Sequence, residues 1–258
     1  MSSINVAILD FEDVNTLEES VIRNVKLDYG GFTEFINNWF PDSSVDILPE
    51  RQIYNSLVSK NLLKTNLHLE CTWFHFTRLL SGTECQISRN GLLPVPFALE
   101  RIWHDLDSIN DGIDVDMMQL KDAAYQSSRF QNKLMNECNW GPYGTLFRDI
   151  ADFDLSNFGY YNYFRMPEII TDIFSAGVGL PGIELLREKY IQKSVPLVVK
   201  IHHERDSIKY IGNAVYFLYL YKVNNESFVD CLRRANTFID FKGQIDPSKI
   251  IYCKKLIS

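Results

Sequence analysis

The chain has 258 residues, of which 46% are hydrophobic and 13% aromatic, so it can bury a substantial core within one large domain. Its net charge of −7 argues against non-specific binding to nucleic acid, which needs many cations to neutralise phosphates. Five scattered cysteines without a CxxC pair disfavour both a thiolate metal site and a disulfide framework. No signal-peptide pattern opens the chain, and its longest apolar run, 214–221, is too short to cross a bilayer, so we expect a reduced, soluble, cytoplasmic protein.

In chain order, the first elements are a short strand and two helical segments. Residues 4–9 are predicted to form the strand. Apolar residues recur at roughly helical spacing through 15–40, where the 30–31 glycine pair interrupts the helix. A turn at 41–44 leads to a second helix at 50–63. The chain therefore begins as a small α/β segment.

The next strand, at 67–77, is rich in aromatic residues and threonine, and an amphipathic segment after it closes on Gly91. The middle of the chain is predicted to be mostly helical, with helices at 97–106, 117–138, 167–174 and 185–192. The last third is predicted to contain strands at 195–202, 215–223 and 250–256 and a short helix at 227–235. This separation of a helical middle from a β-rich last third predicts an α+β fold with a mixed or antiparallel sheet. We expect a single domain over 1–258, with a sheet core at 67–94 and 195–258 and a large, mostly helical insertion at 96–192.

His75, near the end of the 67–77 strand, is the first candidate binding residue. A neutral imidazole offers one donor and one acceptor at a fixed separation, which suits a ribose hydroxyl. Thr77, two residues on, points to the same face of the strand. Arg78 alternates to the other face or begins the following loop, where it could bind a phosphate. The alternative is that His75 is a hydrogen-bonded histidine of the protein interior.

Tyrosines gather at 159–163, where Tyr160, Tyr161 and Tyr163 could stack on a planar ring or donate a hydroxyl to a ligand. The alternative is an aromatic loop packed on the sheet. The segment 140–144, Trp-Gly-Pro-Tyr-Gly, is a turn by composition, and such a turn could also close over a ligand.

The histidine and acidic clusters do not match common metal sites. His202 and His203 are consecutive on a predicted strand, so their side chains face opposite ways and cannot easily share one ion. The acidic residues of 105–116 do not place glycine and glutamate as an EF-hand loop requires. The chain also has no GxSxG, Walker or GxGxxG motif, which disfavours an α/β-type hydrolase and the common nucleotide sites. We therefore expect no bound metal.

Residues 238–251 form a strand–turn–strand pattern near the end of the chain, with Gly243 and Pro247 at the turn. Asp240 lies on the first of these strands. Its carboxylate could reach the same cleft as His75 if the two strands are neighbours. The alternative is that the segment only closes the sheet.

These features together resemble the ADP-ribosyltransferase superfamily. In that superfamily an early strand carries H-x-T or a related arginine pattern, followed by a helix and a Gly-Leu step. A late strand carries a catalytic acid shortly before a G-x-I-x-P-x-x-I closure. Here the early part matches at 75–77 and 87–92 and the late part at 243–250, so the resemblance covers roughly a third of the chain. It is similar to the histidine-type branch, which includes the DNA-targeting ADP-ribosyltransferase toxins, the poly-ADP-ribose polymerases and the rifamycin-modifying enzymes.

The resemblance implies a sheet of the ADP-ribosyltransferase type and roles for the candidate residues. His75 would hold the ribose next to nicotinamide with support from Thr77, and one tyrosine of 159–163 would stack on nicotinamide. Asp240 would stabilise the ribosyl cation as nicotinamide leaves, by opposite charge in a desolvated site. Most members carry glutamate at the acidic position, and Glu204 is a second candidate for the acid.

By this resemblance the chain would be an NAD-dependent mono-ADP-ribosyltransferase-like enzyme of toxin or defence type, with NAD as a substrate and no metal. Its acceptor could be a nucleic acid, a protein or a small molecule. One alternative is a non-catalytic interaction protein whose helical middle binds a protein partner. Another is an RNA 2′-phosphotransferase, which shares the fold but needs arginines such as Arg78 and Arg89 around the phosphates.

Overall fold

The computed structural model describes residues 6–64, 68–152, 166–203 and 207–256. Contacts between residues divide the chain into two compact units. Unit 1 comprises Met1–Trp73, Thr145–Phe153 and His202–Phe238, and unit 2 comprises Phe74–Gly144, Asp154–Ile201 and Ile239–Ser258. The prediction of a single domain with a helical insertion stays a prediction.

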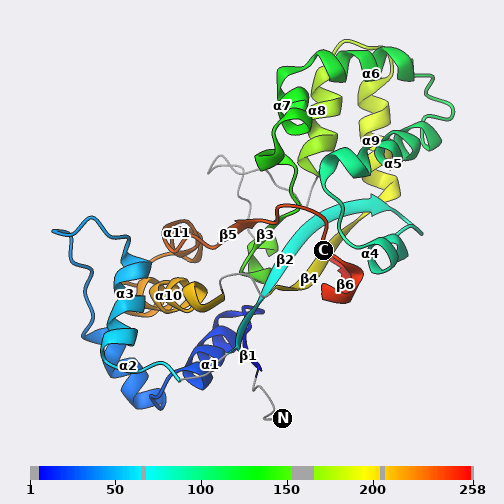
Figure 1. Ribbon diagram of the computed structural model, residues 1–258. Coiled ribbons are helices and arrows are strands. Elements are labelled where there is room, and N and C mark those ends of the chain that lie inside the picture. The colour runs from blue at the N-terminus through cyan, green and yellow to red at the C-terminus, as the bar shows by residue number, and fades with distance from the viewer. Residues whose placement is uncertain (1–5, 65–67, 153–165, 204–206, 257–258) are drawn as a thin grey trace. The chain divides into compact units, whose positions relative to one another are not determined.

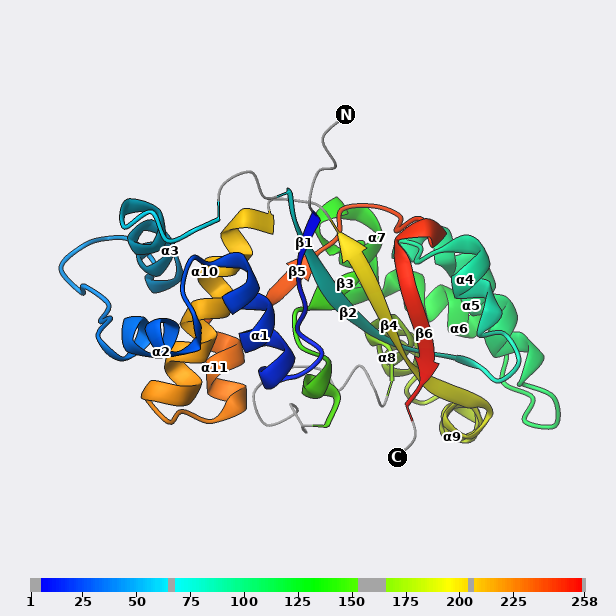
Figure 2. The same ribbon diagram turned by 90° about the horizontal axis from the view of Figure 1, so that it is seen from below.

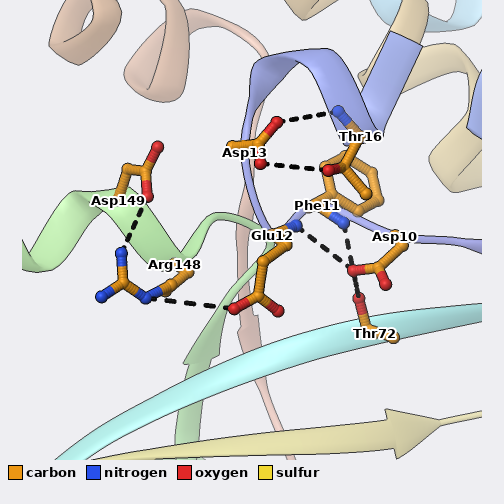
Figure 3. A network of polar contacts seen from close by, with 8 residues as sticks. All are labelled: Asp10, Phe11, Glu12, Asp13, Thr16, Thr72, Arg148 and Asp149. Carbon is orange, nitrogen blue, oxygen red and sulfur yellow. Dashed lines mark hydrogen bonds and ion pairs between the residues drawn. The ribbon is translucent and has the colours of Figure 1, made fainter. Parts of the chain in front are cut away.

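Unit 1 begins with strand β1 (Val6–Leu9), which pairs in parallel with the start of β2 (His68–Leu80). Helix α1 (Val14–Asn24) follows, and the Asp13 carboxylate caps it by accepting a hydrogen bond from the Thr16 amide at 2.8 Å. A polar network surrounds this cap, in which the Thr72 hydroxyl of β2 donates to Asp10 at 3.0 Å (Figure 3). The network ties the end of β1 to β2 before the chain enters α1.

The other helices of unit 1 pack around α10 (Ser207–Leu218), which contacts α1, α3 and α11 (Figure 1). Residues 211–220 are all buried, and α10 continues directly into a π-helical turn, Tyr219–Val223. Phe217 of α10 lies 4.1 Å, centroid to centroid, from Phe147. The other helices of unit 1 are α2 (Tyr29–Asn37), which contacts the π-helical turn, α3 (Pro49–Ser59), the 3₁₀ helix Arg148–Asp152 and α11 (Phe228–Arg234).

Two predictions for unit 1 are wrong. Residues 215–223 form helix rather than strand, because a short continuous apolar run fits a helix buried on all sides as well as a buried strand. The predicted 15–40 helix is two helices, and the break lies at 25–28 rather than at the glycine pair. Asp28 starts α2 by accepting a hydrogen bond from the Gly31 amide at 2.8 Å, so the glycines occupy the first turn of a helix.

The sheet has the strand order β5-β3-β2-β4-β6, and β1 pairs with β2 beside this path. β6 runs antiparallel to β4, with Leu197 opposite Lys255 (Figure 2). With the parallel β1–β2 pair, this gives a mixed sheet, so the predicted α+β class with a mixed sheet is confirmed. The bounds of these strands are β3 (Tyr143–Thr145), β4 (Ser194–His203), β5 (Phe238–Asp240) and β6 (Ile250–Lys255), and a 3₁₀ turn, Pro247–Lys249, precedes β6.

The helices of unit 2 enclose an apolar core of their own. Its fully buried members include Leu106, Leu120, Phe130, Ile173 and Leu186. The predicted 117–138 helix is divided at Ser127 into α6 and α7, and a 3₁₀ turn, Glu137–Asn139, follows. The helices are α4 (Cys85–Asn90), α5 (Val95–Ser108), α6 (Met117–Gln126), α7 (Ser128–Met135), α8 (Glu168–Ala176) and α9 (Ile183–Lys193). Within the described ranges, no helix has both the length and the apolar character needed to cross a bilayer.

Candidate functional site

A cavity of about 150 Å³ lies within unit 2. Its wall is built from the second half of β2, the α4–α5 connection, α5, the 139–143 segment and the first turn of α8. The wall is mainly apolar, and the polar lining residues discussed below are His75, Thr77, Arg78, Lys133, Tyr143 and Glu168. An apolar cavity with a few polar groups is the usual form of a small-ligand site.

His75 is held by one hydrogen bond that decides its tautomer. Its Nδ1 lies 2.6 Å from the carbonyl oxygen of Tyr143. Because a carbonyl only accepts, Nδ1 carries the hydrogen, and Nε2 of the neutral ring is then an acceptor. Burial lowers the pKa of His75, and this outweighs the opposite effect of the bond to Tyr143. The ring is therefore neutral at neutral pH, in the form that can accept a hydrogen bond from a ligand hydroxyl.

Tyr143 interacts with His75 through its backbone carbonyl, and two carboxylates act on its side-chain hydroxyl. Burial, together with the charges of Asp240 and Glu168, raises the pKa of the Tyr143 hydroxyl to about 12. The hydroxyl thus stays protonated and remains a donor at physiological pH. From the sequence, Tyr143 was expected only to lie in a turn that could close over a ligand. The composition of that turn was the only signal that pointed to Tyr143.

Asp240 lies on β5, and β3 separates that strand from β2 and His75. Asp240 lies near Tyr143, because the amide of the next residue, Phe241, donates to the carbonyl of Pro142 at 2.9 Å. It is not among the described residues that line the cavity. Glu204 and the tyrosines Tyr160, Tyr161 and Tyr163 lie outside the described residues.

Arg78, predicted to bind a phosphate, makes side-chain hydrogen bonds within the described part of the fold. Its Nε donates to the Ser194 hydroxyl at 3.0 Å, and its Nη2 donates to the carbonyls of Ile191 and Ser194, both at 2.9 Å. These bonds satisfy carbonyls where α9 ends and β4 begins. Arg78 therefore joins β2 to the α9–β4 junction, and it also lines the cavity.

The early and late segments of the family resemblance meet directly. Leu92 and Ile245 exchange both backbone hydrogen bonds, Leu92 N to Ile245 O at 3.0 Å and Ile245 N to Leu92 O at 2.9 Å. Gly91 has a φ of +75°, and a Cβ on it would lie 1.9 Å from the Ile245 carbonyl oxygen. Only glycine permits this approach, so the Gly-Leu step at 91–92 is needed for the pairing.

Charged residues of α7 and α8 add an ion-pair network that the sequence did not predict. Lys133 Nζ lies 2.7 Å from Glu168 Oε1 and 2.8 Å from Asp172 Oδ2. The Asp172 side chain is fully buried, and Arg129 Nε lies 3.4 Å from its Oδ1. Lys133 and Glu168 are 35 residues apart, so no local spacing could have joined them.

Within the described residues, no group of three or more histidine, cysteine, aspartate or glutamate side chains is placed to hold a metal ion. No family model matches the chain, and neither a curated protein nor a solved structure is significantly similar to it.

Proposed function

We propose that this chain is an NAD-dependent mono-ADP-ribosyltransferase-like enzyme whose cavity beside β2 takes the nicotinamide-ribose end of NAD. The observation that carries the proposal is His75: a neutral imidazole on the cavity wall whose Nε2 is an acceptor, with Thr77 two residues further along the same strand. A cavity of about 150 Å³ is large enough for a single six-membered ring. That size suits nicotinamide and leaves the rest of the dinucleotide outside the enclosed volume.

The reaction breaks the bond between ribose C1′ and the nicotinamide nitrogen, and its electron pair leaves with nicotinamide. His75 would accept a hydrogen bond from a ribose hydroxyl and so orient C1′. Asp240, or Glu204, would stabilise the positive charge that develops on the ribose. Two features support this assignment: Asp240 acts electrostatically on Tyr143 of the cavity wall, and the 91–92 step pairs with the 243–250 closure.

The proposal is tested by calorimetric titration of NAD into the wild type and His75→Ala, with released nicotinamide measured in parallel. We expect the wild type to bind NAD and release nicotinamide. His75→Ala should lose at least about tenfold in affinity, the value of one hydrogen bond to a buried partner. His104→Ala is the matched control, because the side chain of His104 is 82% exposed on α5. Absence of wild-type binding at millimolar NAD would refute the proposal and favour a non-catalytic interaction protein.

A further inference from the structure

Glu168 is presented to the cavity in a defined position. It stands in the first turn of α8, where the helix dipole favours a negative charge, and its side chain is 21% exposed. Lys133 lines the same cavity and holds Oε1 of Glu168 at 2.7 Å. A carboxylate has a second oxygen with its own lone pairs, so this ion pair orients Glu168 and leaves it able to accept a proton.

Lys133 also forms an ion pair with Asp172. The Lys133 side chain is only 12% exposed, and the fully buried Asp172 carboxylate lies 2.8 Å from its Nζ. Arg129 forms a second ion pair with Asp172. Buried ion pairs of this kind rarely add net stability, because desolvation offsets their attraction, whereas they do hold charged groups in one geometry. The network therefore serves to position Glu168 better than it serves to stabilise the helices.

Glu168 lines the same cavity as His75 and Thr77, the residues assigned to the ribose. Its charge also acts on the hydroxyl of Tyr143, the residue whose backbone carbonyl binds His75. Of the two carboxylates that act on Tyr143, Glu168 lines the cavity, and Asp240 is not among the described residues that do. A proton acceptor for an incoming group has to reach the cavity itself.

On the basis of the proposed function, we infer that Glu168 is the general base that takes the proton from the acceptor group, with Lys133 as its positioning residue. The oxygen or nitrogen of the acceptor attacks C1′, nicotinamide leaves with the electron pair of the broken bond, and the acceptor proton passes to the Glu168 carboxylate. The acceptor class is then a neutral hydroxyl or N–H group, which has to lose its proton as its oxygen or nitrogen bonds to C1′. Water is the simplest member of this class.

The test compares Glu168→Gln with the wild type, using NAD with water as the acceptor. Glutamine keeps the size and a hydrogen-bonding oxygen but cannot take a proton. We expect NAD affinity within about threefold of the wild type and a fall in nicotinamide release of about 100-fold or more, the usual effect of a general base. Glu100→Gln, at an exposed position on α5, is the matched control and should release nicotinamide normally.

Glu168→Asp keeps the negative charge opposite Lys133 but shortens the side chain. This variant tests the inference if Glu168→Gln disturbs the fold. Its release should also fall sharply while a thermal melt stays near that of the wild type. Normal release by either folded variant, together with normal NAD binding, would overturn the inference and leave the proposed function standing. Loss of NAD binding in the wild type would overturn both.

Discussion

At the scale of single residues, His75 is defined by what surrounds its ring. The β2 backbone positions the imidazole, and the Tyr143 carbonyl decides which nitrogen carries the hydrogen. Burial then keeps the ring neutral by lowering the pKa. A neutral ring with an acceptor nitrogen is what a ribose hydroxyl requires, so the chemistry depends on tertiary contacts as much as on the residue type.

The lowered pKa of His75 predicts how stability depends on pH. The folded state resists the proton that the unfolded chain takes up near the ordinary histidine pKa of 6.5. The free energy of unfolding should therefore be fully retained above pH 6.5 and fall as the pH drops below it. In His75→Gln this part of the dependence should disappear, as measured by urea unfolding between pH 5 and 8. Identical pH slopes in the wild type and the variant would contradict the lowered pKa.

At the scale of elements, α10 shows how packing overrides local preference. Its β-branched and aromatic residues are typical of strands, yet residues 211–220 are buried on every side of a helix. Gly212 permits this packing, since a Cβ there would lie 2.3 Å from the Glu50 carbonyl oxygen of α3 and 3.0 Å from Cβ of Tyr54. The two helices can approach only because residue 212 has no side chain.

Gly212→Ala should therefore destabilise the protein. Alanine favours helix by about 1 kcal/mol, but forcing a methyl group into closely packed backbone costs more, so we expect a net loss of about 1–3 kcal/mol in the free energy of unfolding. Urea unfolding measures it. Gly30→Ala in α2 is the matched control, because the nearest atom to its added Cβ is 3.8 Å away. An unchanged or increased stability in Gly212→Ala would show that α10 and α3 do not pack as described.

At the scale of the whole molecule, the chain has two compact units, each with its own apolar core. Phe217 belongs to the core of unit 1, where it contacts Phe147. Phe130 belongs to the core of unit 2, where its ring lies 5.3 Å from Tyr125 and 6.2 Å from Trp103. Both phenylalanines are fully buried, so truncating either one removes a comparable amount of packing.

Phe130→Ala and Phe217→Ala should each cost about 3–5 kcal/mol, and most of the effect should stay within one unit. Hydrogen exchange followed by mass spectrometry distinguishes the units. We expect faster exchange mainly at 74–144 and 166–201 in Phe130→Ala, and mainly at 6–64 and 207–237 in Phe217→Ala. An equal rise over both units in either variant would indicate that the whole chain unfolds as one cooperative unit.

Much of the fold could be predicted from local patterns. The strand that carries His75, the strands at 194–203 and 250–255 and the helices α5, α9 and α11 were expected from periodicity and residue type. The 215–223 segment could not be assigned in this way, because an unbroken apolar run has neither the period of a half-buried strand nor that of an amphipathic helix. Its conformation depends on α1 and α3, which pack against α10 and lie far away along the chain.

The sequence by itself determined the α+β class, the strand position of His75 and Thr77, and the Gly91–Leu92 step, because each depends on residues adjacent in the chain. Only the tertiary structure decided which nitrogen of His75 is the acceptor, that Arg78 joins β2 to the α9–β4 junction, and that Lys133 holds Glu168 at the cavity. These features join residues that are 35 to 116 positions apart. Their formation depends on chain folding and burial, which change the hydrogen bonds and charges around a side chain without leaving a local signal in the sequence.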